Sequence, residues 1–213
     1  MADVERLIQD LSADLTPVRR LLSPGVAALS WLGAVTALAL ALGAFADLEA
    51  IGRRLAATPD MWLAVAGSCA TAVLAAFAAF QLGRPDRSPL WSLLPLPAAL
   101  LWIGASGAGC LRDWLVPGTH DASLGETKDC LMFIVGISLP LSALLILMLR
   151  RAYPLRPGLT AAIGGLAAAA AAASLLNFFH PYDAAATDLT VHVVAVALVV
   201  AANRAFGGGL LGG

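Results

Sequence analysis

Charged side chains are scarce in this chain of 213 residues. They make up 13% of it, whereas hydrophobic residues make up 60% and the mean hydropathy is +0.84. So few polar positions cannot coat a water-soluble globule of this size, which indicates that lipid is the solvent. Enzyme motifs are missing as well, because the chain has no Gly-x-Ser-x-Gly, no His-Glu-x-x-His and no phosphate-binding loop. We therefore expect a membrane protein that is not an enzyme.

Six apolar stretches, none with a formal charge in its interior, divide the chain at regular intervals: 24–45, 61–82, 90–109, 131–149, 159–179 and 189–203. Most approach the roughly 20 residues that a helix needs to cross a hydrocarbon core of about 30 Å, and the last is the shortest. Runs of this length without alternating polarity form helices in lipid. The expected fold is all-α: an integral membrane bundle of six transmembrane helices over residues 24–213, preceded by a cytoplasmic arm over residues 1–23. Pro140 falls in the middle of the fourth span, where we expect a bend.

The positive charges are divided unevenly between the two sides of this bundle. Four lie on one side: Arg53, Arg54, Arg112 and Lys128. Nine lie on the side that holds both termini: Arg6, Arg19, Arg20, Arg84, Arg87, Arg150, Arg151, Arg156 and Arg204. The positive-inside rule therefore places both termini in the cytoplasm of a bacterial inner membrane. Arg53 and Arg54 oppose the rule, but Leu48, Ile51 and Leu55 around them predict a short interfacial helix in which arginines are tolerated.

The N-terminal arm has the clearest pattern outside the membrane. Its apolar residues recur at spacings of three and four over residues 1–22: Val4, Leu7, Ile8, Leu11, Leu15, Val18 and Leu22. This spacing predicts one amphipathic helix with a single apolar stripe. A helix that lies on lipid usually has a cationic polar face, whereas this one is acidic until Arg19 and Arg20. The acidity favours a groove on a cytoplasmic protein as the partner, with the membrane interface as the alternative.

Cysteine and histidine gather on the outward side. Cys110 and Cys130 bracket the loop between the third and fourth spans, His120 lies within that loop, and His180 and His192 lie beside the fifth and sixth spans. In an oxidising periplasm the two cysteines can form a disulfide. Together with His180 and His192 they can instead bind a soft or borderline metal ion such as zinc, copper or cadmium. A structural disulfide, a redox or metal sensor, and no relationship at all remain open.

Five phrases occur in order along nearly the whole chain: LIQDLSADLTPVRRLLSP, AAFQLGRPDRSPLWSLLPL, LWIGASGAGCL, MLRRAYPLRPGLTAAIGGLAAAA and FHPYDAAATDLTVHVVAV. In this order and spacing they resemble the NrsF family of bacterial membrane proteins, named for the negative regulator of sigma F. The resemblance implies an inner-membrane anti-sigma factor. Such a protein holds an extracytoplasmic-function sigma factor inactive until a stress on the periplasmic side releases it.

The resemblance also assigns roles to residues. The sigma factor would contact Leu7, Ile8, Leu11, Asp14 and Leu15 of the arm. The arm lacks the zinc-binding His and Cys of another class of anti-sigma domains, so we expect no resident cofactor there. A transient metal ion at Cys110 and Cys130 is the one exception, since these match cysteines that the family uses in signal perception. The expected partners are the sigma factor and the lipid bilayer, without direct binding to nucleic acid.

Two other functions compete with this one. A transporter of ions or small molecules usually needs ionisable groups within the membrane, and the spans offer only His192 and the polar Asn177. A membrane thiol oxidoreductase needs a close, reactive cysteine pair, commonly Cys-x-x-Cys, and a second pair to relay electrons, and neither is present. Both alternatives are weaker than the anti-sigma factor.

Overall fold

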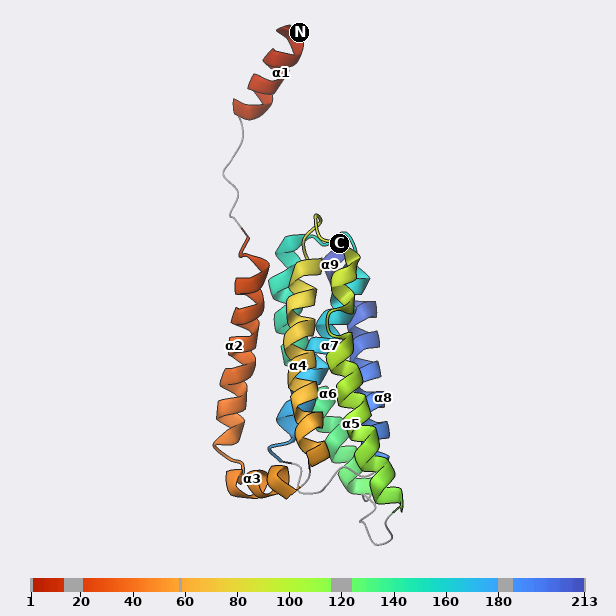
Figure 1. Cartoon of the computed structure of the whole chain (residues 1–213). Coiled ribbons are helices and arrows are strands. Elements are labelled where there is room, and N and C mark those ends of the chain that lie inside the picture. The colour runs from red at the N-terminus through yellow and green to blue at the C-terminus, as the bar shows by residue number, and fades with distance from the viewer. Residues whose placement is uncertain (1, 14–20, 58, 116–123, 180–185, 213) are drawn as a thin grey trace.

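The computed structural model describes residues 2–13, 21–57, 59–115, 124–179 and 186–212. Within these ranges the chain forms helices and no strand (Figure 1). The elements are α1 (Ala2–Ala13), α2 (Pro24–Gly43), α3 (Leu48–Ala57), α4 (Pro59–Leu82), η1 (Pro89–Leu93), α5 (Leu96–Leu115), α6 (Leu124–Leu149), η2 (Arg150–Ala152), α7 (Pro157–Leu176), α8 (Ala186–Ala202), η3 (Asn203–Gly207) and α9 (Gly208–Gly212). The all-α prediction is confirmed for this part of the chain.

In the described part of the chain, six segments are long and apolar enough to cross a membrane, as the sequence predicts. They are Pro24–Gly43, Met61–Leu82, Pro89–Ala108, Lys128–Ala152, Pro157–Leu176 and Leu189–Gly212. The last segment has 24 residues, so the expectation that it is the shortest is wrong. The prediction from the sequence ends this span at Asn203, but the helix continues through a π-helical turn in which Arg204 is exposed. A single exposed charge near a helix end does not stop the helix.

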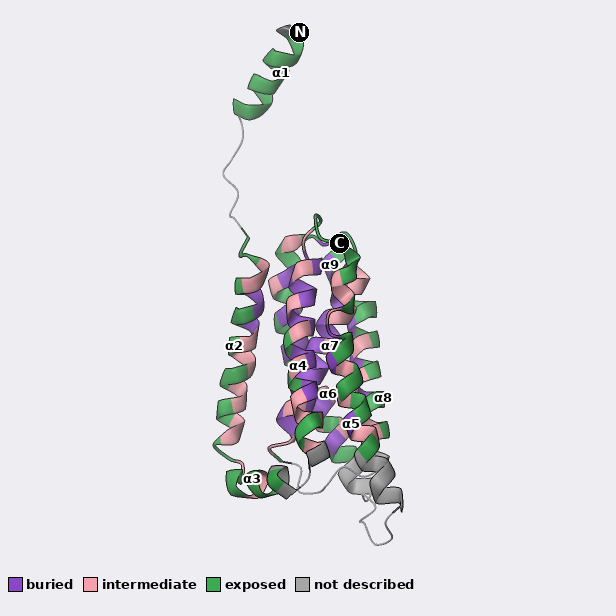
Figure 2. Ribbon diagram, viewed as in Figure 1, coloured by how far each residue is buried: buried purple, intermediate pink, exposed green. Residues whose placement is uncertain are grey.

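Helix α7 forms the centre of the bundle and packs against α4, α6 and α8 (Figure 2). Of the apolar window in this helix, 72% is buried, against 17% in the window of α2. Its residues are mainly alanine and glycine, which allow neighbouring backbones and side chains to approach closely. A methyl group on Gly164 would lie 2.6 Å from Cδ2 of Leu145, and one on Gly165 would lie 2.8 Å from Cβ of Asn203. The small residues of α7 therefore let its neighbours pack closely around it.

Helix α2 lies at the edge of the bundle and is buried mainly in its first turns, while partly buried residues farther along it also pack against the core. Its buried residues are Ala27, Ala28 and Trp31, whereas Leu40 is 73% exposed. The indole Nε1 of Trp31 donates a hydrogen bond of 3.0 Å to the carbonyl oxygen of Leu141 in α6. This carbonyl directly follows Pro140, which lies inside α6 as the sequence places it. The helix that continues from the N-terminal arm is thus joined to α6 beside its proline.

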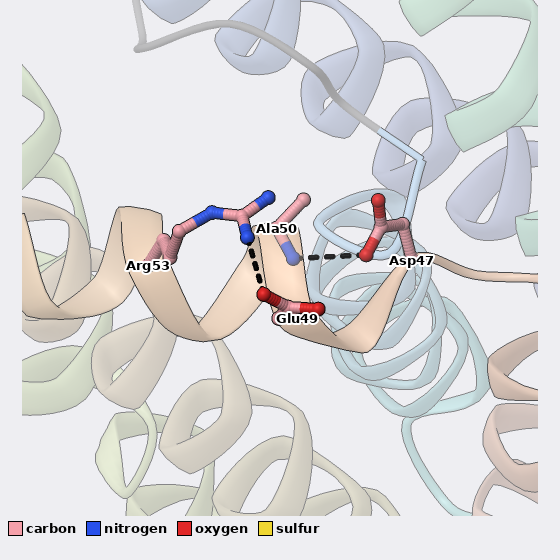
Figure 3. A network of polar contacts seen from close by, with 4 residues as sticks. All are labelled: Asp47, Glu49, Ala50 and Arg53. Atoms are coloured by element: carbon pink, nitrogen blue, oxygen red, sulfur yellow. Dashed lines mark hydrogen bonds and ion pairs between the residues drawn. The ribbon is translucent and has the colours of Figure 1, made fainter.

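Helix α3 is the short helix that the sequence predicts between the first two spans, and it runs from the end of α2 to the start of α4 (Figure 1). Figure 3 shows why it forms there: Oδ1 of Asp47 accepts a hydrogen bond of 2.9 Å from the Ala50 backbone N–H, which caps the helix. One turn further on, Arg53 Nη1 lies 2.6 Å from Glu49 Oε1. Both side chains are exposed, so this ion pair adds little stability.

Candidate functional site

The N-terminal helix α1 presents an apolar stripe without a partner among the described residues. Val4, Leu7, Ile8 and Leu11 are each more than half exposed. They follow a spacing of three and four, which places them on one side of the helix. Figure 1 shows α1 standing away from the bundle, and Figure 2 colours its described residues as exposed. Of the five predicted contact residues, Leu7, Ile8 and Leu11 therefore form an accessible surface, while Asp14 and Leu15 lie outside the described residues.

The prediction of where the arm helix ends is wrong. The helix was expected to continue to Leu22, but Leu21 and Leu22 are not helical. The cause is the start of α2, where Ser23 is extended with φ −61° and ψ 146° and its hydroxyl accepts a hydrogen bond of 3.3 Å from the Val26 N–H. A residue before proline is disfavoured in the helical conformation, so the chain enters α2 through an extended segment.

The base of the arm is held against the end of the bundle where α4 finishes. Arg84 Nη2 donates a hydrogen bond of 3.3 Å to the Leu22 carbonyl oxygen. Thr160 of α7 reaches the same end of α4, with its hydroxyl 3.4 Å from the Leu82 carbonyl oxygen. Between α6 and α7 the chain reverses at Tyr153, which has the left-handed backbone conformation with φ 47°. The arm therefore leaves the bundle at the end where Arg84, Arg150 and Arg151 lie.

Cys130 lies near the opposite end of the bundle and is 5% exposed. It packs in an apolar cluster with Ile134 of its own helix and with residues of two neighbouring helices: Ala172, Leu176 and Ala195. Val191, which directly precedes His192 on α8, packs against this cluster. Within the described residues, α8 contacts both α5, which contains Cys110, and α6, which contains Cys130.

The structure describes only some of the residues of the predicted disulfide and metal site. His180 lies outside the described residues, as do all residues from 116 to 123, and the Cys110 side chain is likewise not described. His192 is partly buried on α8. Among the described side chains, no group of three or more His, Cys, Asp and Glu gathers in a way that would hold a metal ion. The disulfide and the four-residue metal site both remain predictions.

Polar contacts between the long helices are the feature that sequence reasoning missed. Asn203 Nδ2 donates to Ser142 Oγ at 3.0 Å and to the Val199 carbonyl oxygen at 2.9 Å. Ser174 Oγ donates to Ser68 Oγ at 2.9 Å, which joins α7 to α4. Isolated serine and asparagine residues within apolar spans were the available signal, since such groups commonly bond across helices in lipid. Their partners follow only from the packing.

A comparison with protein families identifies the chain. A family model described as negative regulator of sigma F matches residues 11–212, which include all six long apolar segments. The match begins at Leu11, near the end of α1, so it does not include Leu7 and Ile8. No curated protein and no solved structure matches the chain. The resemblance seen in the five phrases is confirmed, and the chain belongs to the family of negative regulators of sigma F, NrsF.

Proposed function

We propose that this protein is a multi-pass anti-sigma factor of the bacterial inner membrane, which sequesters an extracytoplasmic-function sigma factor through its N-terminal arm. The observation that carries the proposal is the exposed apolar stripe of α1 in a member of a family of sigma-factor regulators. A soluble partner that covers Val4, Leu7, Ile8 and Leu11 would remove four large apolar side chains from water. At about 1.5–3 kcal/mol each, their burial would contribute roughly 6–12 kcal/mol before the cost of association.

The proposed orientation places both termini in the cytoplasm. Nine of the thirteen arginine and lysine residues fall on the side that holds the termini, which is the distribution that the positive-inside rule describes. In this orientation α1 extends into the compartment where sigma factors act. Helix α3 and the loop between α5 and α6 then face the periplasm.

We further propose that the periplasmic end senses the stress through Cys110 and Cys130, with His180 and His192 as additional metal ligands. The burial of Cys130 among residues of α6, α7 and α8 supports this proposal. Because that cluster is tightly packed, a disulfide or a bound metal ion at the sulfur would move at least one of these helices. The protein would hold no resident cofactor, and a metal ion would bind only as the signal.

The experiment that tests the partner surface is the substitution Leu11→Asp in the full-length membrane protein. A charge placed on the stripe and buried unpaired in the partner's groove costs several kcal/mol, so affinity should fall by at least about 100-fold. The matched control is Gln9→Asp, which adds the same charge to α1 but lies off the stripe. Co-purification of the sigma factor and transcription from its target genes are measured for both variants.

We expect Leu11→Asp to lose the sigma factor and to switch on its target genes without stress, whereas Gln9→Asp should retain normal repression. Membrane insertion should be equal in the two variants. If Leu11→Asp, at normal protein levels, still binds and represses the sigma factor, then the apolar stripe does not contact this partner. The stripe would then lie on the membrane interface.

A further inference from the structure

The end of the bundle from which the arm leaves carries a strong positive charge. Its described residues, 21–23, 83–95, 150–157 and 203–212, contain one acidic residue, Asp86, whose carboxylate lies 3.8 Å from Arg87 Nε. Six arginines lie at the same end, so its net charge is +5 when the single aspartate is included. We call these six residues the arginine face: Arg84, Arg87, Arg150, Arg151, Arg156 and Arg204.

Contacts between the helix ends show that these arginines lie on one surface. A methyl group on Gly83 would lie 2.9 Å from Cδ2 of Leu149 and 3.6 Å from Cβ of Ala152. Gly83 directly precedes Arg84, and Leu149 and Ala152 flank Arg150 and Arg151 in the sequence, so these three arginines lie near one another. A methyl group on Gly158 would lie 3.9 Å from Cγ of Arg204, which places η3 beside the start of α7. All of the arginines except Arg84 are exposed.

Helix α1 carries the opposite charge. Its side chains include three acids, Asp3, Glu5 and Asp10, and one base, Arg6, for a net charge of −2. Asp3 and Asp10 are seven residues apart, so they lie on the same side of the helix beside the apolar stripe. Arg6 lies between them on that side, so this acidic flank has a net charge of −1. Glu5 lies on the other side of the stripe. A contact through the acidic flank would thus leave Leu7, Ile8 and Leu11 uncovered.

The segment that connects α1 to the arginine face is short. Residues 14–22 join α1 to Ser23, and nine residues span at most about 30 Å when extended. The Leu22 carbonyl is already bonded to Arg84, so the tether starts on the arginine face itself. Single exposed ion pairs are weak, but a short tether raises the effective concentration of α1 at this surface to the millimolar range.

We propose that the arginine face is the docking surface for the acidic flank of α1. The docked helix lies along the cytoplasmic end of the bundle with its apolar stripe exposed, and changes in the packing of α4, α6 or α8 reach it directly through the arginines. This contact requires no sigma factor, so its failure would leave the proposed function intact, and that function has its own test in Leu11→Asp.

Carbodiimide cross-linking tests the contact, because this reagent joins a carboxylate to an amine only when they touch. The chain has one lysine, Lys128, at the far end of the bundle. Arg87→Lys and Arg151→Lys each place an amine on the arginine face without changing its charge. The matched control is Arg53→Lys, an exposed position on α3 at the opposite end. Each variant is studied as the full chain, one copy per nanodisc, and cross-linked peptides are identified by mass spectrometry.

In phosphatidylcholine nanodiscs, peptides of α1 should cross-link to the introduced lysine in at least one of the two face variants, at about ten times the yield of Arg53→Lys. The yield should fall several-fold between about 0.02 M and about 1 M salt, where the Debye length shrinks to about 3 Å. Asp3→Asn with Asp10→Asn should abolish the product, while Glu5→Gln should retain it.

Three results would overturn the proposal. They are the absence of α1 cross-links in both face variants, an equal yield in Arg53→Lys, and loss of the product when phosphatidylglycerol is included in the nanodisc. The last result would assign the arginine face to anionic lipid headgroups instead. Retention of the product in phosphatidylglycerol would support docking of the arm in a bacterial membrane.

Discussion

Gly67 offers a direct test of how the outer helix α5 is held to the bundle. This residue lies in α4, and a methyl group added to it would lie 2.8 Å from both the Cα and the backbone nitrogen of Trp102 in α5. These are backbone atoms, which cannot rotate out of the way as a side chain does. Carbon atoms in contact prefer a separation of about 3.5–4.0 Å, so Gly67→Ala forces α4 and α5 apart by about 0.7 Å or more.

The expected size of the effect follows from two opposing terms. Overpacking of this kind typically costs about 1–3 kcal/mol, and separating two helices along their contact lies at the upper end of that range. Replacing glycine by alanine inside a helix returns up to about 1 kcal/mol. Gly33→Ala in α2 is the matched control, because a methyl group there meets nothing within 4 Å and only the favourable term applies. The two variants should therefore differ by about 1–3 kcal/mol in the free energy of unfolding.

The measurement is reversible unfolding of the purified protein in mixed micelles with increasing dodecyl sulfate, followed by circular dichroism. Gly67→Ala should unfold at a lower fraction of dodecyl sulfate than the unmodified protein, and Gly33→Ala at an equal or higher fraction. If Gly67→Ala proves as stable as Gly33→Ala, the close contact between α4 and α5 does not exist and the packing argument for this bundle is refuted.

Three further predictions address orientation, the α2 contact and sensing. A reporter within 117–126 should be periplasmic and one after the C-terminus cytoplasmic; the reverse result would refute the orientation. Trp31→Phe removes the bond to α6 and should lower the free energy of unfolding by about 1 kcal/mol, whereas Trp62→Phe, at a side chain that is 60% exposed, should have no effect. Cys110→Ser and Cys130→Ser should each alter induction by thiol-reactive metals or oxidants, and the double variant should match the single ones. Normal induction in the double variant would remove both cysteines from signalling.

The sequence was sufficient for features that depend on local composition. Long runs without charge predicted the six apolar helices, and the predicted start of the first run at residue 24 is where α2 begins. The short helix α3 followed from the spacing of Leu48 and Ile51. Local patterns set these elements, because each helix must satisfy its backbone bonds within itself in lipid.

Features that depend on distant residues were beyond the sequence. Nothing in the sequence near Trp31 indicates that its indole donates a hydrogen bond to a carbonyl 110 positions away. Nothing near Gly67 indicates that this glycine packs against the backbone of Trp102. The extension of the last helix beyond Asn203 also depends on tertiary contacts, since Gly207 and Gly208 allow it to pack closely against Ile146 and Gly158. For the candidate site, the sequence predicted the stripe of α1 but not the burial of Cys130 between α7 and α8.

The alanine run of α7 also limits how this protein can change over evolutionary time. Residues 167–173 are all alanine and all buried, so a larger side chain has no space and a glycine removes contacts that the neighbouring helices need. Relatives should therefore keep alanine at most of these positions. On the outer half of α2, by contrast, Leu40 is mostly exposed, and one large apolar residue can replace another without disturbing the bundle. Sequence drift in this family should thus be slow along the central helix and fast along the helix that carries the arm.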